Sequence, residues 1–359
     1  MRRTAGLVIG LLALWSPVTF AQSRLSQHLV IEPVAAVNTS SDLPDDPFVF
    51  LDFTATARMG RGFDFIVRPW VRKMPGSGWS KEMYQLEMRY QSPTRVPVRV
   101  DAGIISSPIG LGTLQLRPDL NSTVSAPSYF FTPLPSFDGY RDGVVLMSGG
   151  YPLGAIVSSS GDRWDVRVGV TDGTAARTRK LFHSGPSPAA QVVAGGGVTL
   201  APGLRVGVGL AHGQYRSAKD LSTLPKRPGA EGPPRVADAT VFNVEGEAAF
   251  GYTTLNGEWI RDRFETVGQP AIARGFRLEA VRTLTPRLFV AGRGIRVTSP
   301  AFTPAGRQSR VMATLEASAG FRLTSDLTLR GGYQGTRSFG VTDWDHAAVT
   351  SIVFSRRWF

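Results

Sequence analysis

The sequence predicts an all-β fold, a transmembrane antiparallel β-barrel of about sixteen strands. Segments of roughly ten residues alternate apolar side chains with polar ones or glycine, and the connections between them are alternately short and long. Strand side chains point to opposite faces with a period of two, so each segment suits hydrocarbon on one face and water on the other. Transmembrane barrels add short turns at one end and long loops at the other.

The N-terminus has the features of a secretory signal peptide. Arg2 and Arg3 precede the apolar run 5–15, and Thr19-Phe20-Ala21 places small residues where signal peptidase reads the chain. We expect cleavage after Ala21, which gives a signal peptide at 1–21 and a single barrel domain at 22–359. No later stretch has the roughly 18 uninterrupted apolar residues that a spanning helix needs, so the mature chain is expected to cross a membrane with strands.

The composition limits the chemistry of the protein and the kinds of partner that it could bind. The 359 residues include no cysteine, so disulfides and thiol chemistry are excluded, and a closed barrel needs neither. The formal net charge of +12 falls to +10 without Arg2 and Arg3. In an exported protein this charge favours anionic solutes and lipopolysaccharide over nucleic acid as partners.

Sixteen segments fit the strand pattern, and an even number lets a barrel close with both ends on one side. In chain order they are 29–37, 48–57, 62–72, 80–90, 95–105, 149–160, 163–172, 189–200, 203–213, 239–250, 252–261, 273–283, 286–298, 310–322, 326–337 and 347–358. Pro97 removes a ladder donor from the fifth segment, and segment 286–298 suits either orientation.

The connections fall into two groups. Those at 59–61, 92–94, 161–162, 201–202, 251, 284–285 and 325 are tight. Those at 38–47, 106–148, 172–188, 214–237, 262–272 and 299–309 are long. A soluble sandwich has no reason to keep its long loops at one end, so this regularity favours a membrane barrel.

Alternation assigns a lipid face and a lumen face to each segment. The predicted lipid-facing sets include Trp164, Val166, Val168 and Val170; Leu204, Val206, Val208 and Leu210; Tyr84, Leu86, Met88 and Tyr90; and Val311, Ala313, Leu315 and Ala317. The opposite parity carries many charges, and an unpaired buried charge costs several kcal/mol. The lumen is therefore expected to hold water. Aromatics near strand ends, Trp70, Trp79, Trp164, Trp259, Tyr333 and Trp358, suit the two membrane interfaces or ordinary packing.

The connection 106–148 is too apolar to extend into water, and a wide barrel offers shelter in its lumen. In this respect the chain resembles the outer-membrane porins, in which the third loop folds inward and narrows the pore. The resemblance makes the following residues of that loop candidates for the constriction: Arg117, Asp119, Tyr129, Phe130, Phe131 and Arg141.

The run Val100-Asp101-Ala102-Gly103-Ile104-Ile105, followed by Pro108-Ile109-Gly110-Leu111-Gly112, resembles the strand-to-loop passage of phosphate-selective porins of the O and P type. That resemblance implies an anion-selective homotrimer with arginines along the lumen. The candidate pore-lining residues, all of lumen parity, are Arg89, Arg99, Asp101, Arg167, Arg205 and Arg330. The third loop has no lysine, unlike the family pattern, so phosphate selectivity itself is not predicted.

Guanidinium groups lining a narrow passage stay charged and raise the local concentration of anions. The alternative is that carboxylates of the same parity neutralise them and leave a weakly selective pore. These carboxylates are Asp64, Glu87, Asp101, Asp165, Glu245, Glu247, Glu258, Glu279 and Glu316. The sequence leaves both possibilities open.

Phe359 ends the chain, and a terminal aromatic is what the outer-membrane assembly machinery recognises in proteins of this class. The parity of Phe359 is otherwise occupied by Ser355 and Arg357, whereas Ile352, Phe354 and Trp358 have the other parity.

We therefore expect a porin in the outer membrane of a Gram-negative bacterium, which lets small hydrophilic solutes diffuse without catalytic residues, metal or cofactor. Two alternatives stay open. A barrel enzyme, a hydrolase or protease, would use one of the four histidines, with Asp345-His346 as the best-placed pair. A closed barrel would act as an anchor or adhesin.

Overall fold

The computed structural model describes residues 28–42, 45–76, 78–92, 97–110, 117–126, 134–135, 151–172, 190–216, 237–266, 269–303 and 306–358. The predicted signal peptide and Phe359 lie outside these residues. Within them, no helix has the length and apolarity to cross a bilayer.

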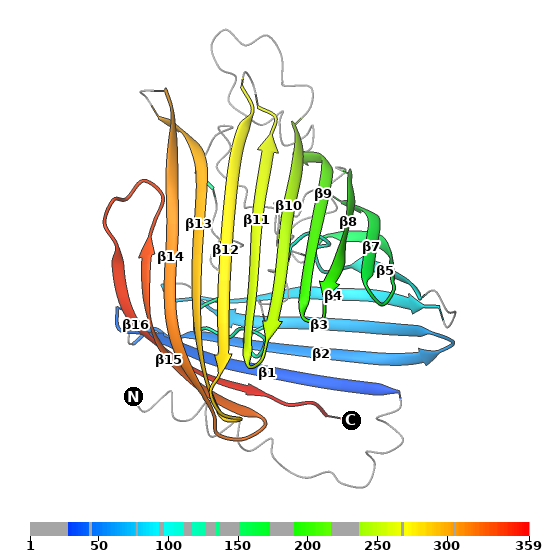
Figure 1. Cartoon of the computed structure of the whole chain (residues 1–359), viewed down its shortest axis with the longest axis horizontal. Coiled ribbons are helices and arrows are strands. Elements are labelled where there is room, and N and C mark those ends of the chain that lie inside the picture. Colours follow the sequence, from blue (N-terminus) through cyan, green and yellow to red (C-terminus); the bar gives the residue numbers. More distant parts are fainter. Residues whose placement is uncertain are drawn as a thin grey trace.

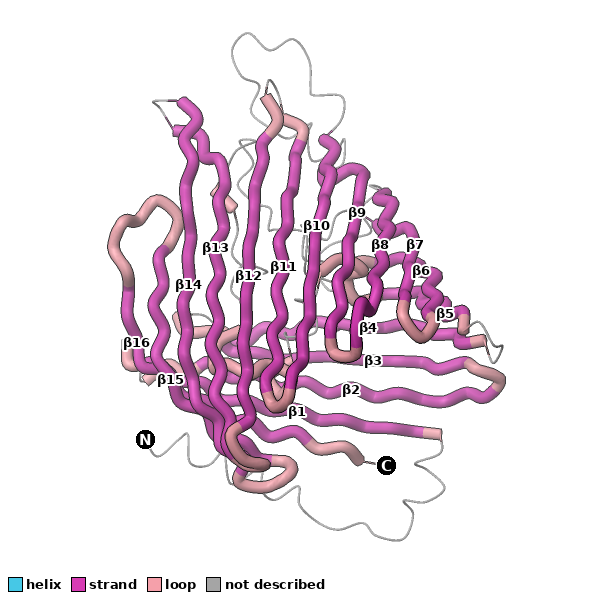
Figure 2. The backbone as a smooth tube through the Cα atoms, in the orientation of Figure 1, coloured by secondary structure: helices cyan, strands magenta, loops and turns pink. Residues whose placement is uncertain are grey.

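In the described part of the chain, sixteen antiparallel strands follow one another around a closed barrel (Figures 1 and 2). They are β1 (Leu29–Ser40), β2 (Phe48–Gly60), β3 (Phe63–Lys73), β4 (Trp79–Gln91), β5 (Val98–Ile104), β6 (Leu153–Ser160), β7 (Trp164–Asp172), β8 (Ala190–Ala201), β9 (Leu204–Arg216), β10 (Ala237–Phe250), β11 (Thr253–Phe264), β12 (Ala271–Thr283), β13 (Leu288–Thr303), β14 (Gly306–Arg322), β15 (Leu327–Arg337) and β16 (Asp345–Ser355). The predicted fold is confirmed, and each predicted segment overlaps one strand.

The barrel closes where β1 pairs with β16, from Val34 opposite Ser355 to Ser40 opposite Val349. Beyond β16 the chain stays beside β1, because Ile31 and Trp358 exchange backbone hydrogen bonds of 3.0 and 2.7 Å. The alternation that puts Ile352 on the outer face thus continues to Trp358.

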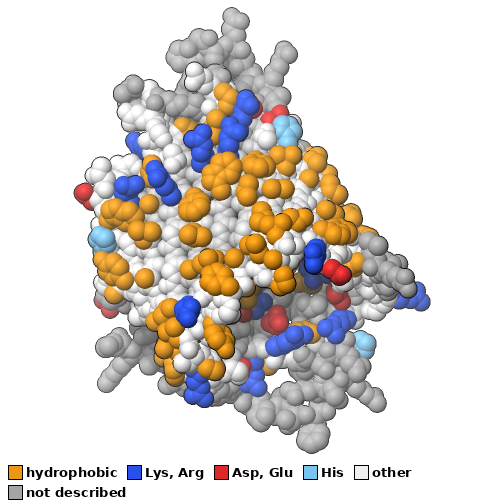
Figure 3. Space-filling view, in the orientation of Figure 1, with side chains coloured by type: hydrophobic (Ala, Val, Ile, Leu, Met, Phe, Trp, Pro, Cys, Tyr) orange, Lys and Arg blue, Asp and Glu red, His pale blue; other side chains and the backbone are white. Residues whose placement is uncertain are grey.

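The outer wall is apolar, as the alternation predicts. Val166, Val168 and Val170 of β7 are 51 to 55 % exposed, whereas Glu245 of β10, on the inner wall, is buried. Figure 3 shows the apolar side chains of one face as a band, with Lys and Arg side chains gathered along its upper border.

A β-bulge reverses the predicted orientation of one aromatic residue. The register between β3 and β4 shifts from Arg68 opposite Gln85 to Pro69 opposite Met83, so Tyr84 has no partner in the ladder. Tyr84 therefore turns inward and is buried, which corrects its assignment to lipid. Trp70, considered for a membrane interface, is also buried, with its ring 4.8 Å from that of Tyr84. Periodicity alone does not reveal an inserted residue.

The predicted long connection 299–309 is instead a strand hairpin. β13 and β14 continue to pair from Ser299 opposite Arg310 to Thr303 opposite Gly306. Pro300 is part of β13. It lies beyond Thr298, the last β13 residue paired with β12, and at such an edge a missing N–H donor is tolerated.

Candidate functional site: the inner wall of the barrel

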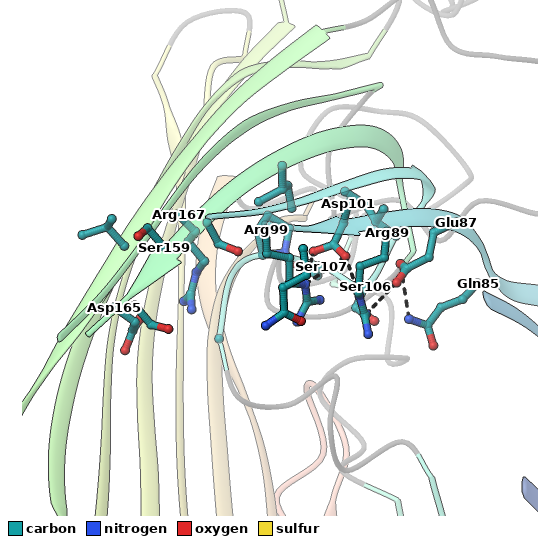
Figure 4. A pocket seen from close by; sticks show the side chains of 18 of the residues that line it. Gln85, Glu87, Arg89, Arg99, Asp101, Ser106, Ser107, Ser159, Asp165 and Arg167 are labelled. Atoms are coloured by element: carbon teal, nitrogen blue, oxygen red, sulfur yellow. Dashed lines mark hydrogen bonds and ion pairs between the residues drawn. The ribbon is translucent and has the colours of Figure 1, made fainter. Parts of the chain in front are cut away.

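A polar cavity of about 760 Å³ lies against the inner wall (Figure 4). Five of the six predicted pore-lining residues line it, from β4, β5, β7 and β9: Arg89, Arg99, Asp101, Arg167 and Arg205. The sixth, Arg330, is buried on β15 and lies outside this cavity.

Strand alternation and register bring the first charged group together. Glu87 and Arg89 of β4 alternate with Leu86 and Met88, which are 37 and 47 % exposed on the outer face. Arg89 lies directly opposite Asp101 of β5. It forms ion pairs with Asp101 at 2.8 Å and with Glu87 at 2.7 Å (Figure 4).

Asp101 is shared between two arginines. Arg99 lies 2.6 Å from its second carboxylate oxygen. The Arg99 side chain remains 44 % exposed, compared with 24 % for Arg89. Arg99 is therefore the more accessible cation of this group.

A second charged group crosses β7, β9 and β10. Arg205 lies 2.8 Å from both Asp165 and Glu245, and Arg167 lies 3.6 Å from the same Glu245. Glycines make room for these side chains. A Cβ on Gly197 would lie 2.5 Å from the Arg205 guanidinium, and one on Gly207 would lie 2.7 Å from the Glu245 carboxylate. At these two positions, strand glycines leave space in the lumen for charged side chains.

The cavity carries nearly balanced charge. Its described lining residues include six arginines, at positions 68, 89, 99, 117, 167 and 205, and five carboxylates, at positions 87, 101, 165, 245 and 247. The excess is a single positive charge. Every one of these arginines has a carboxylate within 4 Å, so the wall is largely neutralised in pairs.

Aromatic rings pack beside the cavity around a buried ion pair. Arg68 lies 2.7 Å from Asp52, and both side chains are almost fully buried. Arg68 also donates to the Tyr151 hydroxyl at 3.2 Å, and the Tyr151 ring lies 4.4 Å from that of Tyr84. The sequence did not indicate this cluster, because the bulge hides Tyr84 and Tyr151 lies just before β6.

Part of the connection between β5 and β6 contacts inward-facing side chains on β1 and β16. Arg117 pairs with Asp119 at 2.6 Å and with Glu32 of β1 at 3.3 Å. Asp119 also accepts a hydrogen bond of 3.0 Å from Ser355 of β16. Burial alone would raise the pKa of Asp119, but the hydrogen bonds from Arg117 and Ser355 hold that pKa below its ordinary value.

The next residues are held by charged side chains of β13, β14 and β15. The Glu316 carboxylate accepts hydrogen bonds from the backbone N–H groups of Val124 at 2.7 Å and Ser125 at 3.1 Å, and it also contacts the Ser125 hydroxyl. Arg293 pairs with Glu316 at 3.0 Å. Arg330 donates to the carbonyl of Thr123 at 3.1 Å, which explains why it is buried away from the cavity.

Two of the predicted constriction residues, Arg117 and Asp119, are therefore placed against strands on the inner wall. Tyr129, Phe130, Phe131 and Arg141 lie outside the described residues. Residues 121–125 were not among the predicted constriction residues. Their signal was the lumen parity of Glu316, which required a hydrogen-bond partner once buried.

Asp345 and His346, the pair considered for catalysis, lie on opposite faces of β16. His346 stacks on Tyr333 at 5.7 Å on the outer face, and Asp345 has the opposite parity. No group of three or more potential metal ligands occurs in the part of the chain that the structure describes.

Comparisons with known proteins place the fold. No protein-family model and no curated protein matches the chain. Among solved structures, OprB of Pseudomonas putida aligns with a TM-score of 0.60 at 12 % identity over 94 % of this chain and 96 % of its own. A loop L8 deletion mutant of OmpT, an outer membrane protein of Vibrio cholerae, gives 0.55 at 11 %, over 92 and 98 %. A porin refined at 1.8 Å gives 0.51 at 12 %, over 91 and 99 %.

At these identities the shared property is the fold, that of outer-membrane barrels of Gram-negative bacteria. The more specific resemblance to phosphate-selective porins stays a prediction.

Proposed function

We propose that the protein is an outer-membrane porin through which small hydrophilic solutes diffuse passively, without a reaction or cofactor. One observation carries the proposal: a closed sixteen-stranded barrel has an apolar outer wall and an inner wall with a polar, charged cavity. Charged side chains of this wall stay accessible, 44 % for Arg99 and 50 % for Glu247, which supports a lumen that holds water.

The second part of the proposal is that connection 105–152 folds inward and narrows the pore. The connection leaves from β5, and its residues 117–126 bind β13, β14, β15, β16 and β1. In a ring of sixteen strands, β5 and β13 lie on opposite sides. A segment that starts at one wall and hydrogen-bonds to the other supports a path across the lumen.

We further propose that selectivity is weak, with a slight preference for anions. The described lining residues of the cavity have one positive charge in excess, and their arginines are paired, so the field that they create is small. The proposal combines the two possibilities that the sequence leaves open: carboxylates neutralise most of the lumen arginines, and a slight preference for anions remains. The homotrimer and the recognition of Phe359 by the assembly machinery remain predictions.

Planar-bilayer recording of the refolded mature barrel tests the proposal. We expect a stable, ohmic conductance, and in a salt gradient a small reversal potential on the side of anion permeability. Swelling of proteoliposomes in neutral solutes of graded size should give rates that fall with solute size. A silent membrane together with no swelling would favour an anchor or adhesin, and hydrolysis of peptides or esters by the same preparation would favour an enzyme.

A further inference from the structure

A groove of about 760 Å³ runs along the outer wall over β12 to β15. Gly292 and Gly294, at outward positions of β13, form part of its lining. Phe276 and Leu278 line it from β12, and Leu315 lines it from β14. These three side chains are 47 to 58 % exposed, so the groove is a depression within the apolar band.

The space beside these two glycines is not filled by neighbouring atoms of the described residues. A Cβ on Gly292 would meet only a backbone oxygen at 3.8 Å, and one on Gly294 would meet only Leu315 at an ordinary 3.4 Å. A larger side chain would therefore fit at either position without displacing backbone. The depression is available to an occupant, and its lining is suited to hydrocarbon.

Three arginines border the groove toward the end of the barrel that carries the long connections. Arg274, Arg296 and Arg337 occupy the outward positions next to Phe276, Gly294 and Gly335 along their strands. Arg296 and Arg337 both pair with Ala313, so their strands are separated by about 10 Å. None of the three forms an ion pair with a carboxylate of the described residues.

A cation–π contact connects the three arginines to the groove. The Arg337 guanidinium lies 5.5 Å from the ring of Trp344, which lines the groove. An occupant of the groove would thus meet apolar side chains along its length and three guanidinium groups at one end. That combination suits an amphiphile with acyl chains and a phosphorylated head.

We propose that this groove is a binding site for the lipid A part of lipopolysaccharide, with an acyl chain over Gly292 and Gly294 and a phosphate on Arg274, Arg296 and Arg337. In outer-membrane barrels the long loops face the exterior, so this edge lies in the leaflet that lipopolysaccharide forms. Guanidinium groups bind phosphate oxygens with two parallel hydrogen bonds, which favours arginine at such a site. The proposal rests on the barrel fold and not on the transport activity.

Native mass spectrometry of the detergent-solubilised barrel, titrated with lipid A that carries both phosphates, tests this site. We expect one tightly held lipid A per barrel. The double variant Arg274→Ala with Arg296→Ala should bind lipid A about tenfold more weakly or worse, because each substitution removes charge-assisted hydrogen bonds to phosphate. Gly294→Leu, which fills the groove and leaves the arginines in place, should also weaken binding.

Two matched controls separate the site from general effects. Arg282→Ala removes an outward arginine of β12 near the short turns, where it donates to Thr253. Gly331→Leu adds bulk at a β15 glycine with open space around it. Both should bind lipid A as the wild type does, and all variants should keep the heat-modifiable mobility of a folded barrel.

The chemistry of the head group has its own test. Lipid A stripped of its phosphates, and phosphatidylglycerol with the same acyl chains, should each bind more weakly than lipid A. Equal binding of phosphatidylglycerol and lipid A would overturn the assignment to lipopolysaccharide. Wild-type affinity in both the double arginine variant and Gly294→Leu would overturn the site itself.

Discussion

At the scale of single residues, the inner wall is organised by shared carboxylates. Asp101 contacts both Arg89 and Arg99, and Glu245 contacts both Arg167 and Arg205. Arg89 has a second carboxylate partner in Glu87, and Arg205 has one in Asp165. Arg99 has the most exposed side chain of these four arginines, 44 % compared with 22 to 24 %, so it is the one that a passing ion would sense.

Replacing Arg99 by glutamate should move the selectivity toward cations. Arg99→Glu changes the charge beside the cavity by two units, and it places a carboxylate near Asp101 at a position that is half exposed. We expect the anion-to-cation permeability ratio to fall by about threefold. Reversal potentials in a KCl gradient measure the ratio.

The control for this change is Arg282→Glu, which makes the same charge change on the outer face of β12. Its reversal potential should match that of the wild type. If Arg99→Glu also keeps the wild-type reversal potential, Arg99 does not contribute to selectivity.

Acid should weaken the contact between the connection from β5 to β6 and the inner wall. The pKa of Asp119 is depressed in the folded state, so its ionised form stabilises the fold above its ordinary pKa, and this contribution disappears as the pH falls through the depressed value. We expect constant single-channel behaviour from neutral pH to about pH 5 and larger fluctuations below about pH 4. Recordings across that range measure the effect.

Asp119→Asn provides the comparison, because its amide cannot ionise. At neutral pH it should show the fluctuations that the wild type shows in acid, and its own acid response should be smaller. An acid response of full wild-type size in Asp119→Asn would assign the effect to another group.

At the scale of elements, residues 117–126 have no regular secondary structure and are fixed by strand-borne side chains. Glu316 alone binds two backbone N–H groups and the Ser125 hydroxyl. Leaving buried donors without an acceptor costs about 1 to 3 kcal/mol each. Loss of this one carboxylate should therefore weaken the attachment of the segment to the wall.

Glu316→Ala should release this segment. We expect a larger or noisier conductance in bilayers, because the segment loses its main acceptor while the strands of the barrel stay paired. Glu247→Ala, which removes a half-exposed carboxylate of the cavity lining, is the matched control and should keep the wild-type noise. Wild-type conductance and noise in Glu316→Ala would contradict a role for this contact in pore width.

The elements also show what the sequence could predict. Each strand was predictable because its two faces meet different solvents, which imposes the alternation on residues such as Val166 and Arg167. The bulge at Tyr84 and the long β13–β14 hairpin were not, because both depend on pairing with a neighbouring strand. The partners of residues 117–126 were hidden for the same reason: Ser125 and Glu316 meet only after the barrel has closed.

At the scale of the whole molecule, all but one of the strand pairs join neighbours in the chain. The exception is β1 with β16, which brings together residues such as Thr39 and Thr350, 311 positions apart. An even strand number could be predicted from the sequence, but the register of this last pair could not, since no turn fixes it. Closure is thus the step that turns fifteen local hairpin contacts into a lumen.

A disulfide across that seam tests closure directly. The chain has no cysteine, so two introduced thiols have no competitors. The hydroxyl oxygens of Thr39 and Thr350 lie 2.7 Å apart on the outer face, which brings their Cβ atoms near disulfide range. Thr39→Cys with Thr350→Cys should oxidise in the folded barrel, and after heating in SDS the oxidised chain should migrate faster than the reduced chain. Thr39→Cys with Thr253→Cys, whose second thiol is on distant β11, should show no such difference. Equal mobility of oxidised and reduced Thr39–Thr350 variants would mean that β1 and β16 do not meet in this register.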